Sequence, residues 1–215
     1  MTAPDELPDG TGVPRWRTRG VEVRYENPWI RVTHREVVAP TGAPGIYGVV
    51  HFRHRAVGVV ALDDARRVWL VGQWRYTLDA WSWEIPEGGA TGGEAPVEAA
   101  RRELAEECGL AAASWTPLVE VHTSNSVTDE LGRVWLARGL SSVPSAPDET
   151  ERLVVRRVAL DEAVAMALDG RITDSLSVAA LLKLGLLDAR GELGRADEVP
   201  EGAPVDGVPA HGARR

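Results

Sequence analysis

Cysteine is almost absent from this 215-residue chain, which contains a single one, Cys108. An internal disulfide and a zinc site built from several cysteines are therefore excluded. The sequence also lacks a run of 18 apolar residues and a signal-peptide pattern near Met1. We therefore expect no membrane partner, and a cytoplasmic location is the default expectation.

Runs of basic residues are absent as well, and 32 acidic side chains against 24 Lys and Arg give a net charge of −8. Nucleic-acid surfaces are built from clustered Lys and Arg, so this balance argues against nucleic acid as a partner. It does not argue against a phosphate-bearing substrate, because a bound cation can invert the local charge. The hydrophobic share of 44% and the eight Trp residues are enough for a core.

Composition divides the chain into four parts. Residues 1–13 and 190–215 are rich in Pro, Gly and charged residues, which predicts disordered tails. Within residues 14–53, alternating apolar and polar positions predict an antiparallel N-terminal sheet. Its expected strands are 21–25, 30–39 and 46–53.

Residues 54–189 read as one larger α/β domain. Its strands and helices are intermixed, which favours a mixed sheet with helices on both faces. The expected strands are 56–62, 68–73, 115–122, 133–140 and 153–158, with a loop around Trp81 and Trp83. The expected helices are 96–108, 162–168 capped by Asp161, and one ending at Leu187 that is capped by Asp174 or Ser175.

The most informative stretch is Gly88–Leu110, a glycine-rich segment that turns into a predicted helix. Pro96 suits the first helical turn, and Gly109 stands where a left-handed C-terminal cap would fall. At about 100° per residue, Val97, Ala100, Leu104 and Cys108 form one apolar stripe. This stripe predicts the buried face of the helix.

Glu103, Glu106 and Glu107 form a neighbouring stripe on the same predicted helix. Like charges three and four residues apart repel and weaken a helix, so a compensating charge is expected. A hard divalent cation with oxygen ligands, typically Mg²⁺, is the natural partner. The alternative is an ordinary solvated acidic face.

The same stretch resembles the Nudix hydrolases. Their signature is matched in full at nine positions over 23 residues, namely Gly88, Glu94, Arg102, Glu103, Leu104, Glu106, Glu107, Gly109 and Leu110. The resemblance implies an α/β/α sandwich with a mixed sheet. Residues 14–53 look like the small N-terminal subdomain of the ADP-ribose pyrophosphatase branch, which takes part in dimerisation there, so a homodimer is expected.

Several site roles follow from this resemblance alone. Glu103 and Glu107 would be metal ligands, with Glu106 in the same cluster and the Glu87 backbone carbonyl as a further ligand. The cation would be Mg²⁺, for which Mn²⁺ can substitute. Arg102 and Glu106 are candidate catalytic residues, although Arg102 also suits a structural ion pair with Glu94.

The resemblance places the general base outside the signature, on a loop about 40 residues further on. Glu149 matches the base and Glu151 a further metal ligand. The two lie close enough in sequence for their roles to be exchanged, and Glu130 is the alternative base. An ordinary acidic loop also remains open for these residues.

Substrate contacts are expected upstream of the signature and in the polar segment 123–132. Arg75 resembles an arginine that contacts pyrophosphate, and Glu84 stands where that branch has a substrate-contacting glutamate. Ser124 and Asn125 are the candidates in the polar segment. Arg75 and Glu84 could instead be ordinary surface residues, and the nearby Trp rings suit either a base site or a core.

The resemblance implies a Mg²⁺-dependent pyrophosphatase that hydrolyses nucleoside diphosphate sugars to a nucleoside monophosphate and a sugar phosphate. ADP-ribose, GDP-mannose or a similar compound would be the substrate. The expectation is not restricted to ADP-ribose, because the Ser-Pro-Gly motif usual in ADP-ribose pyrophosphatases is replaced by residues 123–130. A hydrolase of dinucleotides or dinucleoside polyphosphates is the alternative. A non-catalytic regulatory module would predict a degraded signature and an added basic domain, and neither is present.

Overall fold

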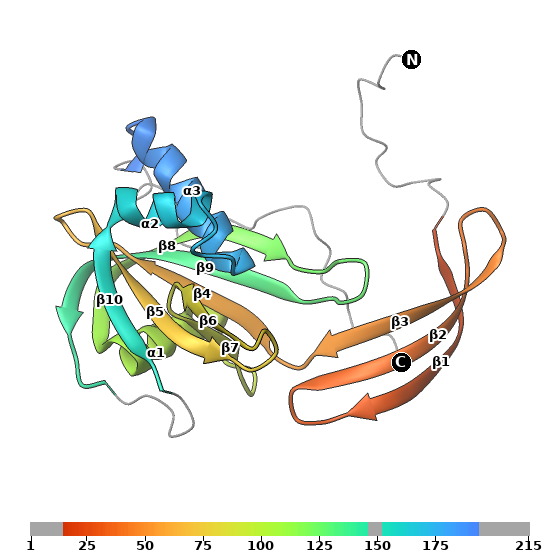
Figure 1. Cartoon of the computed structure of the whole chain (residues 1–215). Coiled ribbons are helices and arrows are strands. Elements are labelled where there is room, and N and C mark those ends of the chain that lie inside the picture. The colour runs from red at the N-terminus through yellow and green to blue at the C-terminus, as the bar shows by residue number, and fades with distance from the viewer. Residues whose placement is uncertain (1–14, 146–151, 194–215) are drawn as a thin grey trace, which may run out of the picture. The chain divides into compact units, whose positions relative to one another are not determined.

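The computed structural model describes residues 15–145 and 152–193 (Figure 1). The chain divides into two compact units. The N-terminal unit comprises the residues up to Arg55 together with His122–Leu131, and the larger unit comprises Ala56–Val121 and the chain from Gly132 onward. The predicted tails lie outside the described residues, apart from residues 190–193.

The N-terminal unit is a three-stranded antiparallel sheet of β1 (Arg17–Glu26), β2 (Ile30–Val38) and β3 (Pro44–Phe52), in that order. Asn27 shapes the first turn, because its side-chain oxygen accepts hydrogen bonds from the backbone N–H groups of Trp29 and Ile30. The predicted antiparallel sheet is confirmed: β1 runs longer than the predicted 21–25, whereas β2 and β3 lie within two residues of the predicted 30–39 and 46–53.

The loop between β8 and β9, His122–Leu131, belongs to this N-terminal unit. Val50 on β3 donates a backbone hydrogen bond to Val127 over 2.8 Å. The Nδ1 atom of His51 lies 2.6 Å from a carboxylate oxygen of Asp129. The loop is therefore held to the edge of the small sheet by both backbone and side-chain contacts.

The larger unit contains two further sheets. One has the order β7-β4-β9-β8, with β4 and β9 parallel, and the other has the antiparallel order β10-β5-β6. The strands are β4 (Arg55–Ala61), β5 (Arg67–Arg75), β6 (Ala80–Glu84), β7 (Glu87–Ala90), β8 (Leu110–His122), β9 (Leu131–Ser142) and β10 (Val154–Ala159). The expected mixed pairing is confirmed, whereas Trp81 and Trp83 lie in β6 rather than in a loop.

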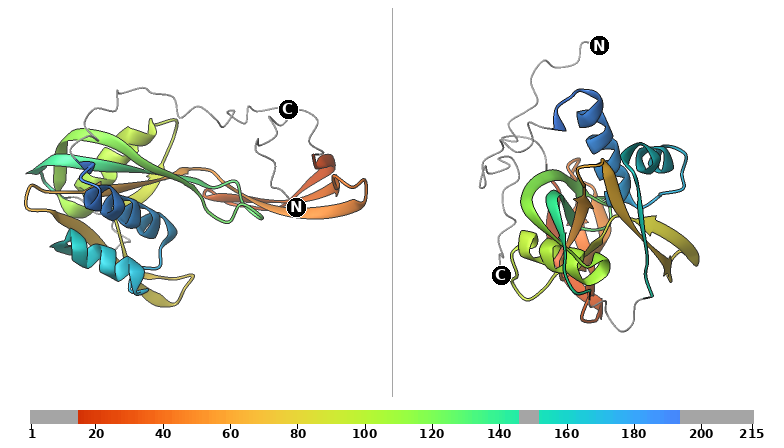
Figure 2. Two further views of the ribbon diagram at one scale, coloured as in Figure 1. Left: turned by 90° about the horizontal axis from the view of Figure 1, so that it is seen from above. Right: turned by 90° about the vertical axis from the view of Figure 1, so that its left-hand side faces the viewer.

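Alternating residues of β4 face opposite sides of its sheet. Val57 and Val59 pack into a cluster with residues of α1 (Pro96–Cys108). Val60 packs into a second cluster with residues of α2 (Leu160–Leu168) and α3 (Ser175–Ala189). Two views of the ribbon place α1 on one side of the sheet and α2 with α3 on the other (Figures 1 and 2). The predicted α/β/α arrangement is confirmed.

The helix ends test the predicted caps. Gly109 follows α1 with φ of 63°, the left-handed conformation that glycine adopts without strain. Asp174 caps α3 by accepting a hydrogen bond from the backbone N–H of Ser177. The predicted cap at Asp161 is wrong, because α2 already begins at Leu160 and leaves Asp161 in its first turn. No described helix is long and apolar enough to cross a membrane.

Candidate active site

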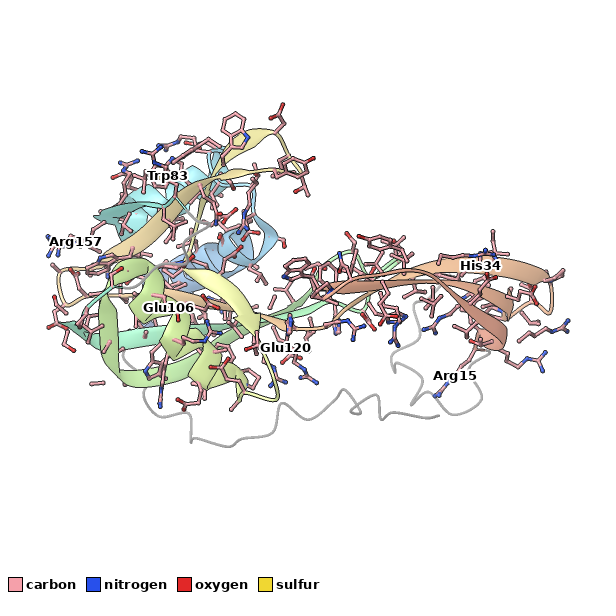
Figure 3. All side chains as sticks on the ribbon, turned by 90° about the horizontal axis from the view of Figure 1, so that it is seen from below. Arg15, His34, Trp83, Glu106, Glu120 and Arg157 are labelled. Carbon is pink, nitrogen blue, oxygen red and sulfur yellow. The ribbon has the colours of Figure 1, made fainter. Side chains whose placement is uncertain are left out.

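The signature begins in β7, which contains Gly88 and Gly89, and its glycine-rich segment continues from there to α1. Pro96 occupies the first turn of α1, and the buried side chains of Ala100 and Leu104 attach the helix to the sheet. Packing of this apolar stripe fixes the rotation of the helix and therefore the direction of its acidic stripe. Figure 3 labels Glu106 on this helix.

Arg102 joins the glycine-rich segment to α1. Its guanidinium donates to the Glu94 carboxylate at 3.1 and 3.3 Å and to the Gly89 carbonyl at 3.0 Å. It also donates to Glu103 at 2.8 Å and to Glu106 at 3.0 Å. The predicted ion pair with Glu94 is therefore present, and Arg102 supplies the positive charge that offsets the acidic stripe.

The pKa of the Glu94 carboxyl is lowered by its hydrogen bond with Arg102. The pKa of Glu103 is raised, because burial outweighs the opposing effect of the same guanidinium. Both carboxyls are hydrogen-bonded to Arg102, so the burial of Glu103 explains why its pKa shifts in the direction opposite to that of Glu94. A cation placed beside Glu103 would favour its ionised form.

Glu107 is buried, with 6% of its surface exposed. One of its carboxylate oxygens accepts a hydrogen bond from the backbone N–H of Glu87 over 3.0 Å. The acidic stripe of α1 therefore holds the peptide bond between Pro86 and Glu87, one residue before the signature glycine Gly88. This contact orders the backbone whose next carbonyl, that of Glu87, is the candidate metal ligand.

Arg75 and Glu84 lie together on the paired strands β5 and β6. Arg75 Nε donates to Glu84 at 2.8 Å, and its Nη2 atom donates to Glu84 at 2.5 Å and to Glu87 at 2.9 Å. Burial alone would lower the pKa of Arg75, but its hydrogen bonds and charge interactions with the two carboxylates raise it. Glu84 is 3% exposed and therefore contacts Arg75 from within the protein.

Sequence reasoning assigned no role at this site to Asp174, yet its carboxylate lies beside that of Glu87. Burial, followed by the negative charges of Asp174 and Glu84, raises the pKa of Glu87 well above its ordinary value. The Oε2 atom of Glu87 is buried and receives no hydrogen bond from the described residues. The sequence offers no signal for this contact, because it joins residues 87 positions apart.

The donor set fits a hard divalent cation, which prefers carboxylate and carbonyl oxygens. The described residues contain no ready-made group of three acidic, His or Cys side chains that could hold a metal ion. Arg102 contacts Glu103 and Glu106, and the Glu87 amide contacts Glu107. A cation bound by Glu103 and Glu106 would therefore compete with Arg102 for their carboxylate oxygens.

The sequence predicts five further candidate residues. Ser124 and Asn125 belong to the His122–Leu131 loop of the N-terminal unit. Glu130 is in the same loop, where it accepts a hydrogen bond from the hydroxyl of Thr123 over 2.7 Å. Glu149 and Glu151 lie outside the described residues. Ser145, just before them, donates its hydroxyl hydrogen bond to the Glu106 carbonyl over 2.7 Å.

Comparisons with known proteins identify the same family as the signature does. Residues 52–181 match the NUDIX domain family. An ADP-ribose pyrophosphatase of Mycobacterium tuberculosis is 39% identical over 62% of this chain, and the match spans 65% of that protein's length. A CMP-5'-(N-acetyl-N-hydroxy-3-aminopropyl)phosphonate hydrolase of Streptomyces rubellomurinus is 31% identical over 84% of this chain and 87% of its own.

A solved structure described as an ADP compounds hydrolase superposes with a TM-score of 0.75. It covers 85% of this chain and 99% of its own, at 22% sequence identity, and therefore supports the fold. The match to the domain family, the full signature and the α/β/α arrangement around it lead to the same conclusion. This chain belongs to the Nudix family of pyrophosphate-bond hydrolases.

Proposed function

We propose that this protein is a Mg²⁺-dependent pyrophosphatase that hydrolyses nucleoside diphosphate sugars, ADP-ribose or a close analogue among them. The products would be a nucleoside monophosphate and a sugar phosphate. One observation carries the proposal: the complete signature is folded as the end of a strand, a loop and a helix, with Arg102 joining Glu94, Glu103 and Glu106. A merely solvated acidic face would not require such a shared, partly buried arginine.

The metal ligands would be Glu103, Glu107 and the backbone carbonyl of Glu87, with Glu106 beside them. When bound, the cation would stabilise charge on the phosphate oxygens, orient the substrate and lower the pKa of the attacking water. Mg²⁺ is the expected ion, and Mn²⁺ should substitute because it takes similar oxygen ligands. Arg102 would keep the carboxylates gathered and their repulsion low before the cation binds.

Arg75 would bind the pyrophosphate of the substrate. Its Nε and Nη2 atoms are engaged by Glu84 and Glu87, whereas Nη1 donates to no residue within the described ranges. Glu84 and Glu87 would therefore orient the guanidinium and leave that nitrogen for a phosphate oxygen. In this proposal Glu84 acts on the substrate through Arg75, whose guanidinium it holds.

The proton of the attacking water would pass to Glu149, with Glu151 as a further metal ligand. These roles rest on the sequence resemblance. The chain just before residues 146–151 is anchored on α1 by the bond between Ser145 and the Glu106 carbonyl. Glu130 remains the alternative base, and Ser124 and Asn125 remain candidates for substrate contact.

A substrate other than ADP-ribose is favoured by one specific observation. One relative, which matches 84% of this chain, acts by its name on a CMP-linked phosphonate. A site related to it would accept a pyrimidine nucleotide joined to a group that is not a sugar. Nucleotide conjugates of this kind are the second candidate class.

The N-terminal sheet would form a homodimer. Several large apolar side chains of the N-terminal unit are about half exposed or more, which is unusual for a surface that meets only water. They are Val21, Val23, Tyr25, Trp29 and Ile46. Sedimentation at micromolar concentration should show a dimer, and an active monomer would contradict this proposal. The expected cytoplasmic location stays a prediction.

A substrate panel tests the proposed function. ADP-ribose, GDP-mannose, UDP-glucose, NADH and a diadenosine polyphosphate would each be incubated with Mg²⁺, and the products treated with phosphatase to release phosphate. We expect phosphate to be released from a nucleoside diphosphate sugar by the wild-type protein, but not when the Glu107→Gln variant replaces it. Release from none of the compounds would contradict the proposal.

A further inference from the structure

Ser177, on a helix outside the Nudix signature, contacts the chain two residues before Glu87. Its hydroxyl oxygen accepts a hydrogen bond from the backbone N–H of Ile85 over 2.9 Å, and neither residue is exposed by more than 1%. A buried N–H that loses its only partner is costly, so this contact strongly determines the local backbone. The bond ties the first turn of α3 to the chain two residues before Glu87.

Asp174 fixes the place of Ser177. Its carboxylate accepts a hydrogen bond from the Ser177 backbone N–H over 2.7 Å, as the N-cap of α3. N-terminal caps hold the first turn of a helix in its regular conformation. The hydroxyl of Ser177 therefore points to Ile85 from a turn that is itself held in place.

The remaining backbone groups around Glu87 are held from other directions. The Pro86 carbonyl accepts a hydrogen bond from Val59 on β4 over 2.8 Å. The Glu87 N–H donates to Glu107 on α1 over 3.0 Å. Contacts from α3, β4 and α1 therefore fix the segment 85–87. The Glu87 carbonyl, the candidate metal ligand, follows directly in the chain.

We propose that Ser177, held in place by Asp174, is a positioning residue that aims the Glu87 carbonyl at the metal ion. This inference rests on the proposed function, because it requires the Glu87 carbonyl to be a ligand. Ser177 would act without touching the metal ion or the substrate. Groups that orient metal ligands from outside the ligand set commonly change metal affinity by 10- to 100-fold when removed.

The experiment compares Ser177→Ala with Ser175→Ala. Both serines lie in the first turn of α3, but Ser175 is exposed. The free Mn²⁺ concentration is followed by electron paramagnetic resonance during titration of each protein, with no substrate present. The Mn²⁺ dissociation constant should rise by roughly tenfold in Ser177→Ala and stay at the wild-type value in Ser175→Ala.

Steady-state kinetics provide the second readout. At saturating metal, Ser177→Ala should keep a kcat and a substrate KM near those of the wild-type enzyme, while the metal concentration for half-maximal rate rises. Circular dichroism confirms that each variant is folded. If Ser177→Ala does not fold, Ser177→Cys replaces it, because a thiol of similar size is a weaker acceptor.

The outcomes separate this inference from the function on which it rests. If the wild-type protein binds Mn²⁺ through Glu107 and the folded Ser177 variant binds it with unchanged affinity, the positioning role alone is overturned. Wild-type protein whose hydrolysis needs no divalent cation overturns the proposed function, and the inference with it. A rise in the Mn²⁺ dissociation constant confined to the Ser177 variant supports the proposal.

Discussion

The carboxylate of Glu103 lies directly over Gly88. A Cβ atom added to Gly88 would be 2.2 Å from the Glu103 carboxyl carbon and from one of its oxygens. Real Cβ atoms do not approach other heavy atoms so closely, so only glycine at position 88 leaves room for this side chain. The first residue of the signature therefore serves the geometry of a carboxylate on the helix that follows.

The substitution Gly88→Ala should displace the Glu103 side chain and lower the affinity for the divalent cation. We expect hydrolysis at subsaturating Mg²⁺ to fall by roughly tenfold or more. Gly48→Ala is the matched control, because a Cβ atom there would meet nothing within 4 Å. Equal metal dependence in the Gly88 variant and the wild-type enzyme would show that Glu103 is not a ligand in the position observed.

The substitution Glu107→Gln should abolish most of the activity while the protein stays folded. A neutral amide is a poor ligand for a hard cation, but its oxygen can still accept the hydrogen bond from the Glu87 backbone. We expect kcat to fall by about a hundredfold or more and the melting temperature to change little. Glu98→Gln, at an exposed site on the same helix, is the control. Near wild-type turnover by the Glu107 variant would reject the metal assignment, and Glu103→Gln should behave as Glu107→Gln does.

The proposed base is tested by three glutamine variants, at Glu149, Glu151 and Glu130. A general base acts in the chemical step, so Glu149→Gln should lower kcat by about 10² to 10⁴-fold and leave substrate KM nearly unchanged. Glu151→Gln should raise the metal concentration needed for activity. If Glu149→Gln keeps full kcat at saturating Mg²⁺ and another variant loses it, the role of base moves to that residue.

Cys108, the only cysteine, should resist thiol reagents in the native protein. Burial, followed by the negative charge of Glu107, raises the pKa of its thiol to about 12. The thiolate is the reactive form, so at pH about 8 modification should be slow until denaturant restores a pKa near 8.5. Rapid labelling of the native protein, measured by mass spectrometry, would contradict the partly buried placement of this side chain.

Local signals in the sequence predicted much of this structure. Gly109 and Asp174 marked a helix end and a helix start correctly, because glycine and aspartate favour these positions for reasons within one turn of chain. The alternating positions of β1–β3 predicted their sheet in the same way. Asp161 failed as a cap because strand β10 runs directly into α2, so packing sets that boundary rather than side-chain capping.

Contacts between distant segments could not be predicted. The hydrogen bond between Ile85 and Ser177 joins residues 92 positions apart, and neither residue type indicates which partner it will have. The sequence predicts a site role for Arg75, but its double contact with Glu84 and Glu87 depends on the pairing of β5 with β6. The sequence therefore identifies the residues of the candidate site more readily than the partners that orient them.

The central claim is that the carboxylates of α1 support metal-dependent hydrolysis of a pyrophosphate bond. Phosphorus-31 NMR measures this directly, by following ADP-ribose or a similar nucleotide conjugate with Mg²⁺, with chelator, and with the Glu107→Gln variant. The account predicts that the two pyrophosphate signals are replaced by two phosphomonoester signals only for wild-type protein with Mg²⁺. Pyrophosphate signals that persist for every nucleotide conjugate tested, or that disappear equally with chelator, would contradict it.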